Sequence, residues 1–187
     1  MSYLFYSFIN FDDTFDVKIN NLERQNYVNT IKNERRRAQS VAVWKLLEYA
    51  SKRLFGGIFD YFESNGAWFV KNSNIKFSLA HSNNLVAVLI DENDVVGVDC
   101  ELVSDKLLKL EKFFSANAIG FSNISHKLKF IAKQWTKKES LIKANKNLKG
   151  EYRFVKNGSE EYCIYGSSAS PIKFVKINFT NIIKETI

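Results

Sequence analysis

The sequence predicts an α+β fold made of two similar α/β halves with pseudo-twofold symmetry, about residues 1–94 and 95–187. A hydrophobic fraction of 45% with 16 Phe is typical of a folded core, and helical sequence followed by strand-rich sequence occurs twice. With one Pro, eight Gly and no low-complexity tract, no flexible linker separates the halves. We therefore expect a single domain over residues 1–187.

The first half is expected to begin with a strand and continue with a helix. The opening residues 1–13 are apolar and strand-like, and apolar residues recur at helical spacing within residues 22–54. The pair Gly56-Gly57 ends that helix. Strand-like segments follow at residues 67–71, 76–80, 85–90 and 95–101, and we expect the last two to pair as a hairpin across the polar turn 91–94.

The second half repeats this order of helices and then strands. Helical sequence occupies residues 106–114 and 125–144, and the strand-rich pieces are residues 151–155, 161–165 and 171–179. Asn157-Gly158, between the first two of these pieces, is a strong hairpin signal because both residues tolerate positive φ.

Composition limits the compartment and the partners. Two cysteines, Cys100 and Cys163, are too few for a disulfide framework, so a reducing, cytoplasmic location is expected. The N-terminal segment has no basic stretch of the kind that signal peptides carry, and no apolar run approaches the length of a membrane span, so no membrane partner is expected. The formal charge of +7 favours an anionic partner without identifying it.

Two carboxylates interrupt the apolar stretch VVGVDCELV. In a strand, Asp99 and Glu101 point to one side while Val98 and Cys100 point to the other. Like charges on a largely apolar element repel and lose hydration, so a cation, hydrogen-bond donors or water must compensate them. The alternative for the pair alone is a solvated edge strand.

A third carboxylate is expected in the helix that contains WTKKESLIK. Glu139 falls within the apolar stripe formed by Leu128, Ile131, Ala132, Trp135 and Ile142. The alternative is an exposed Glu139–Lys143 pair of little energetic consequence. Three carboxylates that converge would form an oxygen site for a hard divalent cation such as Mg²⁺.

Two further segments carry candidate phosphate-binding groups. KFSLAHSNN ends its strand-like run at His81 and Ser82, which could donate hydrogen bonds to a phosphate, although a lone His is more often structural. NERRRAQSVAVWK opens a helix with Arg35, Arg36 and Arg37, which span most of a turn and cannot share one face. A solvated basic helix start is the alternative.

In this order, the segments resemble the 4′-phosphopantetheinyl transferase superfamily, particularly its monomeric branch of two similar halves. The family's Gly-Val-Asp-x-Glu strand is matched by Gly97, Val98, Asp99 and Glu101. Its Trp-x-x-Lys-Glu-(Ala/Ser)-x-x-Lys motif is matched by Trp135, Lys138, Glu139, Ser140 and Lys143, and its Phe-Asn-(Ile/Leu)-Ser-His-Ser motif is represented by residues 77–82.

The resemblance implies an Mg²⁺- or Mn²⁺-dependent enzyme that moves 4′-phosphopantetheine from coenzyme A to a serine of an acidic apo carrier protein (acyl, peptidyl or aryl) and releases 3′,5′-ADP. It implies that Asp99, Glu101 and Glu139 hold the metal, and that Glu139 accepts the serine proton. The groups that it implies for the coenzyme phosphates are Lys138, Lys143, His81, Ser82 and Arg36. Arg36 is preferred to its neighbours because it precedes the basic Lys45 by nine residues, as in the family.

The chain departs from the family pattern at Ala67, Ala80, Ala118, Asn145 and Asn147. These departures leave a second hypothesis open, a degenerate paralogue that binds coenzyme A or carrier protein without turnover. A third hypothesis is a basic nucleic-acid-binding domain, which would leave the carboxylates unexplained. The resemblance favours the transferase, with no nucleic-acid partner and a monomeric state.

Overall fold

The structure of the protein is a computed structural model that describes residues 1–14, 17–65, 67–114 and 121–186. It mixes α-helices and β-strands, which confirms the α+β class. The N-terminal elements are β1 (Ser2–Phe8), η1 (Phe11–Thr14), α1 (Leu22–Asn29), α2 (Glu34–Phe55), β2 (Tyr61–Ser64), β3 (Ala67–Val70), β4 (Lys76–Ser82) and β5 (Leu85–Asp91). The others are β6 (Gly97–Leu102), η2 (Asp105–Phe113), α4 (Ile124–Ala144), β7 (Gly150–Asn157), β8 (Glu160–Ser167), β9 (Ile172–Lys176) and α5 (Phe179–Thr186).

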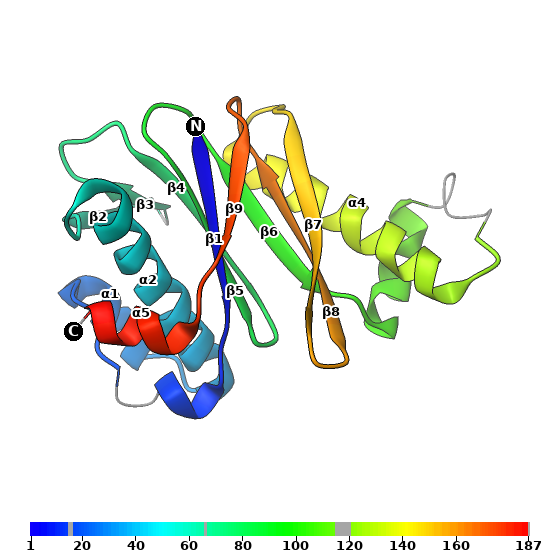
Figure 1. The fold of residues 1–187 in the computed structure, drawn as a ribbon, viewed down its shortest axis with the longest axis horizontal. Helices are drawn as coiled ribbons and strands as arrows, with labels where there is room; N and C mark the ends of the chain where they lie inside the picture. The colour runs from blue at the N-terminus through cyan, green and yellow to red at the C-terminus, as the bar shows by residue number, and fades with distance from the viewer. Residues whose placement is uncertain (15–16, 66, 115–120, 187) are drawn as a thin grey trace.

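Two sheets lie face to face between two long helices, which makes four layers (Figure 1). One sheet has the strand order β4-β5-β1-β9 and the other β6-β8-β7, while β2 and β3 form a separate small hairpin. Residues of both sheets, among them Leu4, Leu89, Val98 and Ile164, pack in the apolar layer between them. α2 covers the outer face of the first sheet, and α4 covers that of the second.

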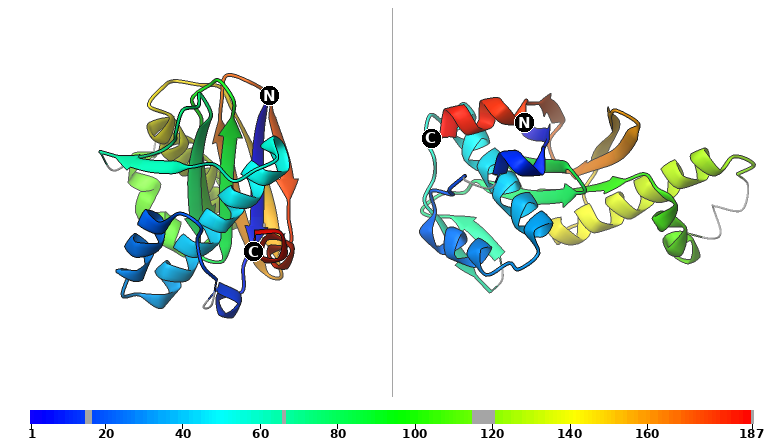
Figure 2. Two further views of the ribbon diagram at one scale, coloured as in Figure 1. Left: turned by 90° about the vertical axis from the view of Figure 1, so that its left-hand side faces the viewer. Right: turned by 90° about the horizontal axis from the view of Figure 1, so that it is seen from below.

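The end of the chain returns to the N-terminal sheet. β9 pairs in parallel with β1, and α5 lies beside α2 (Figure 2). The fully buried Lys45 donates from Nζ to Thr186 O at 3.1 Å and pairs with Glu48 at 2.7 Å, so it ties α2 to the last turn of α5. The sequence prediction ended the chain with a strand and missed α5, whose buried Phe179 and Ile182 repeat at helical spacing.

The prediction of one continuous helix over residues 22–54 is wrong. The chain forms two helices, α1 and α2, separated by residues 30–33. Asn33 caps α2 because its side-chain oxygen accepts the Arg36 N–H at 2.9 Å. Asn at this position offers the backbone an alternative to a continuing helix, which explains the break.

The hairpin predicted between residues 85–90 and 95–101 is also wrong. β5 pairs with β4 on one edge and β1 on the other, so both of its hydrogen-bonding edges are used. Asp91 then accepts the N–H groups of Asn93 and Asp94, both at 3.0 Å, and this turn leads the chain into the second sheet. There β6 pairs with β8 instead.

The hairpin at Asn157-Gly158 is confirmed, with its loop one residue later than the motif suggests. Asn157 pairs with Glu160, so Gly158 and Ser159 form the two-residue loop between β7 and β8. Gly158 has φ +59°, a conformation that glycine adopts without the strain of a side chain.

Candidate functional site

The carboxylates of β6 share one side of the strand, as the alternation predicts. Val98 and Cys100 are buried between the sheets, whereas Asp99 and Glu101 are half-buried on the side that faces α4. Burial raises the pKa of the Asp99 carboxyl, and burial together with the nearby Asp99 charge raises that of Glu101. The folded protein therefore holds two carboxylates whose charged forms are disfavoured.

Serine hydroxyls of β4 bridge the gap to β6, because these two strands do not form a backbone ladder. Ser78 Oγ accepts the Val98 N–H at 3.0 Å, and Ser82 Oγ accepts the Leu102 N–H at 3.1 Å. Ser82 Oγ also donates to Glu101 Oε1 at 3.0 Å. Ser82, predicted to contact a phosphate, thus orients a predicted metal ligand in this structure.

Gly97 allows α4 to lie unusually close to β6. A Cβ at this position would lie 1.8 Å from Ser140 O, a backbone atom of α4. Ser140 is itself fully buried and shares a hydrogen bond of 2.7 Å with Ser167 of β8. The close approach brings the helix, with Glu139 and Lys143, over the carboxylate side of β6.

The predicted apolar stripe of α4 needs correction. The buried positions are Leu128, Ile131, Ala132, Thr136, Ser140 and Ala144, whereas Ile142 is 59% exposed and Trp135 is half-buried. The prediction missed Thr136, Ser140 and Ala144, which are small or polar and were not counted as part of the apolar pattern. Glu139 therefore lies at the border of the buried stripe, where it is half-buried and close enough for its charge to raise the Asp99 pKa.

Lys143 pairs with Asp99 across the helix–strand contact. Its Nζ lies 2.8 Å from Asp99 Oδ1, 3.0 Å from Val98 O and 3.4 Å from Leu79 O. The alternative prediction for these residues was an exposed ion pair between Glu139 and Lys143 on the helix surface. The ammonium instead reaches β6, where it opposes the effect of burial on the Asp99 pKa.

The donor chemistry of this site fits a hard divalent cation. Asp99, Glu101 and Glu139 supply only oxygen ligands, and burial, with a smaller contribution from charge repulsion, raises the pKa of the first two. In residues 1–14, 17–65, 67–114 and 121–186, no three acidic, His or Cys side chains are arranged tightly enough to ligate a metal together. An ammonium group occupies the position beside Asp99.

A group of cations surrounds His81 on β4. Loss of hydration and the positive charges of Lys143, Arg36 and Arg24 lower the pKa of the His81 imidazole, although the residue as a whole is exposed. Arg24 was not predicted. Its guanidinium lies over the rings of Tyr27, Trp44 and Trp68 and donates to Ser40 Oγ at 2.7 Å. This group, which includes Lys143, is a candidate anion site.

A cavity of about 470 Å³ adjoins Glu101 and Ser82. Arg35 lines it and is held in place by Asn83 Oδ1 and by the Phe11 ring, 4.7 Å away. The remaining lining residues are Asn83, Leu102, Ser104, Lys106, Leu107, Lys109, Leu110 and Trp135. Arg35 was one of three candidate arginines in the sequence, although Arg36 was preferred. The sequence did not identify Lys106 or Lys109 as site residues, because only the fold brings η2 to this cavity.

Lys138 and the departures from the motifs lie at separate places in the fold. Lys138 Nζ lies 5.3 Å from the Phe113 ring centroid and 5.4 Å from that of Trp135, over aromatic rings. Ala80 is buried between the sheets, and Asn145 has φ +49° as the C-cap of α4, which preserves a turn where the family has Gly. Ala67 opens β3 and Asn147 is exposed after α4, while Ala118 lies outside the described residues.

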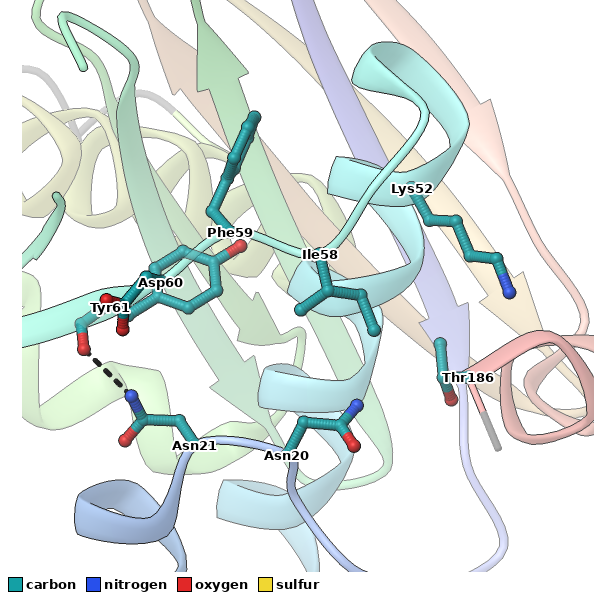
Figure 3. A pocket seen from close by; sticks show the side chains of 8 residues that line it. All are labelled: Asn20, Asn21, Lys52, Ile58, Phe59, Asp60, Tyr61 and Thr186. Atoms are coloured by element: carbon teal, nitrogen blue, oxygen red, sulfur yellow. Dashed lines mark hydrogen bonds between the residues drawn. The ribbon is translucent and has the colours of Figure 1, made fainter. Parts of the chain in front are cut away.

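A second cavity, of about 430 Å³, is lined by none of the predicted site residues (Figure 3). Its walls include Asn20, Phe59 and Asp60, and Asn21 Nδ2 donates to Tyr61 O at 2.8 Å. Lys52, on the same wall, donates to Glu185 O at 2.6 Å and so helps to hold α5.

No protein-family model matches the chain, and a search of curated proteins found no significant match. The site must therefore be interpreted from its own geometry. Within the described part of the chain, no helix is both long and apolar enough to span a bilayer.

Proposed function

We propose that the protein is a 4′-phosphopantetheinyl transferase, which moves the phosphopantetheine arm of coenzyme A to a serine of an acidic apo carrier protein. One observation carries this proposal. Side chains of β6 and α4, the two elements that carry the motifs, meet at Asp99. Lys143 forms an ion pair with Asp99, and the charge of Glu139 raises the Asp99 pKa. Asp99 and Lys143 are 44 residues apart in sequence, so only the fold brings the two motifs together at this contact.

The layer arrangement supports the finer fold assignment. Each sheet is covered on its outer face by one long helix, α2 for the first sheet and α4 for the second, which is the repetition expected of two related halves. The candidate site lies where β4 of the first sheet meets β6 of the second. A substrate bound there would contact both halves, as the pseudo-twofold architecture of the family implies.

The reaction is a displacement at phosphorus. The serine Oγ of the carrier forms a bond to the phosphorus that bears the pantetheine arm, and the bond from that phosphorus to the bridging oxygen breaks. The bridging oxygen leaves with 3′,5′-ADP. The serine proton passes to the Glu139 carboxylate, directly or through water.

The other residues bind and orient. Lys143 and Lys138 offset negative charge on the phosphates, and His81 with Arg36 contacts a coenzyme phosphate. Ser82 keeps Glu101 in position. Asp99, Glu101 and Glu139 would hold a divalent cation, Mg²⁺ or Mn²⁺, which when bound neutralises the pyrophosphate charge.

The decisive experiment is intact-mass measurement of apo carrier proteins incubated with the enzyme, coenzyme A and Mg²⁺. Transfer adds one phosphopantetheine, roughly 340 Da. Asp99→Asn and Glu139→Gln should fold normally and abolish the mass shift, whereas Glu23→Gln, on the exposed side of α1, should not change it. Chelation with EDTA should stop transfer without unfolding the protein.

The outcomes separate the alternatives. Coenzyme A binding without any mass shift would replace the proposal with a non-catalytic paralogue. Full transfer by Asp99→Asn or Glu139→Gln would show that these carboxylates are not part of the machinery. Salt-sensitive binding to generic duplex DNA, with neither coenzyme binding nor transfer, would favour the nucleic-acid hypothesis.

A further inference from the structure

The Lys143 ammonium occupies a cation position that is lined entirely by oxygen atoms. Asp99 Oδ1, Val98 O and Leu79 O lie 2.8, 3.0 and 3.4 Å from Nζ. Two of these oxygens belong to β6 and one to β4, and the side chain reaches them from the last turn of α4. The contact therefore closes the junction of three elements with a positive charge that the protein itself supplies.

We propose that Lys143 is an internal counter-ion that occupies Asp99 in the ligand-free protein and must leave it when a divalent cation binds. This inference rests on the proposed function, because it concerns the metal that the transferase would use. An ammonium and a divalent cation cannot both lie within contact distance of the same carboxylate oxygen without strong repulsion. Metal binding thus competes with the Lys143–Asp99 ion pair.

Release of Lys143 has a second effect. Its side chain is 34% exposed and carries three N–H donors on a flexible stem, so the ammonium can turn from Asp99 toward an anion outside the strand. The charges of Arg36 and Arg24, which act on His81 together with that of Lys143, would attract that anion. The metal and a phosphate-bearing ligand should therefore bind cooperatively, since each favours the released position of Lys143.

The chain contains a matched control on the same helix. Lys137 is also a lysine of α4 but is exposed, two turns from the end of the helix, and lies outside the proposed site. Met replaces either lysine with a side chain of similar length, no charge and good helix propensity. Lys143→Met and Lys137→Met thus remove the same charge from two positions, only one of which is beside Asp99.

In the test, the full-length protein is titrated with Mn²⁺ alone. Binding is measured by isothermal titration calorimetry and by the loss of the electron paramagnetic resonance spectrum of free Mn²⁺. Lys143→Met should bind Mn²⁺ about 5- to 150-fold more tightly than the wild type, the range typical of coupled sites. Lys137→Met should match the wild type. Circular dichroism checks the fold, and Lys143→Gln takes the place of Lys143→Met if that variant unfolds.

A second titration includes saturating coenzyme A without carrier protein. Coenzyme A should strengthen the binding of Mn²⁺ by the wild type more than it strengthens the binding by Lys143→Met. The reason is that the variant has no ammonium group that could move from Asp99 to the phosphates. Equal or weaker Mn²⁺ binding by Lys143→Met, or no Mn²⁺ binding by any variant, would overturn the inference.

The result is separable from the proposed function. Tighter Mn²⁺ binding by Lys143→Met in a protein that transfers nothing would support the counter-ion role and remove the transferase. If the wild type transfers phosphopantetheine and Lys143→Met binds Mn²⁺ with the affinity of the wild type, the counter-ion role alone is overturned.

Discussion

Replacing Gly97 with Ala should push α4 away from β6. The added Cβ would lie 1.8 Å from Ser140 O and 2.9 Å from Ala144 N, whereas an ordinary van der Waals contact begins at 3.4 Å. Both obstructing atoms belong to the helix backbone, so no side-chain rotation relieves the overlap. Overpacking of this kind costs about 1–3 kcal/mol, and we expect a value near the upper limit because two backbones are forced apart.

The loss is measurable by thermal unfolding followed by circular dichroism. In a protein of this size, 1 kcal/mol shifts the Tm by about 2–4 °C, so Gly97→Ala should lower it by about 6–12 °C. Gly57→Ala is the control, since a Cβ there meets nothing within 4 Å. An unchanged Tm for Gly97→Ala would refute the close packing of α4 on β6. Transfer by the folded variant should fall as well, because α4 carries Glu139 and Lys143.

Three further predictions concern the buried charges and the carrier. Lys45→Met should lower the free energy of unfolding by about 3–5 kcal/mol in urea titration, because Glu48 is left buried without its cation; a neutral result would mean that the pair is dispensable. Glu101→Gln should raise the Tm at pH 7 but not near pH 4. The folded protein binds the Glu101 proton more tightly than the unfolded chain does, because the pKa of Glu101 is raised on folding. The stability of the wild type therefore falls as the pH rises from the ordinary carboxyl pKa through the raised one. The same dependence of Tm on pH in Glu101→Gln would contradict this. The KM for the acidic carrier should rise with NaCl at saturating coenzyme A while kcat changes little; a salt-independent KM would remove electrostatic steering.

Local patterns were sufficient to predict several features of the candidate site. Strand alternation alone placed Asp99 and Glu101 on one side and Val98 and Cys100 on the other. Asn157-Gly158 located a hairpin, and the residues after Ala144 ended α4 with Asn145 at positive φ. Each of these features depends on the backbone preferences of a few consecutive residues, and those residues can be read directly from the sequence.

Strand pairing could not be predicted in the same way. β5 and β6 are neighbours in sequence, yet β5 pairs with β4 and β1 while β6 pairs with β8. Backbone hydrogen bonds join strands and are nearly independent of side-chain identity, so adjacency in sequence is a weak guide to partners. The return of α5 to α2 depends in the same way on a buried lysine contact across the chain.

The sequence by itself determined the residue types of the candidate site and the side of the strand or helix on which they lie, because local geometry controls both. Only the tertiary structure decided that Lys143 binds Asp99, that Arg35 enters the cavity beside Glu101, and that Gly97 is the position where α4 touches β6. Those contacts depend on distances between elements far apart in the chain. Such distances are set by the packing of the complete core rather than by any single segment.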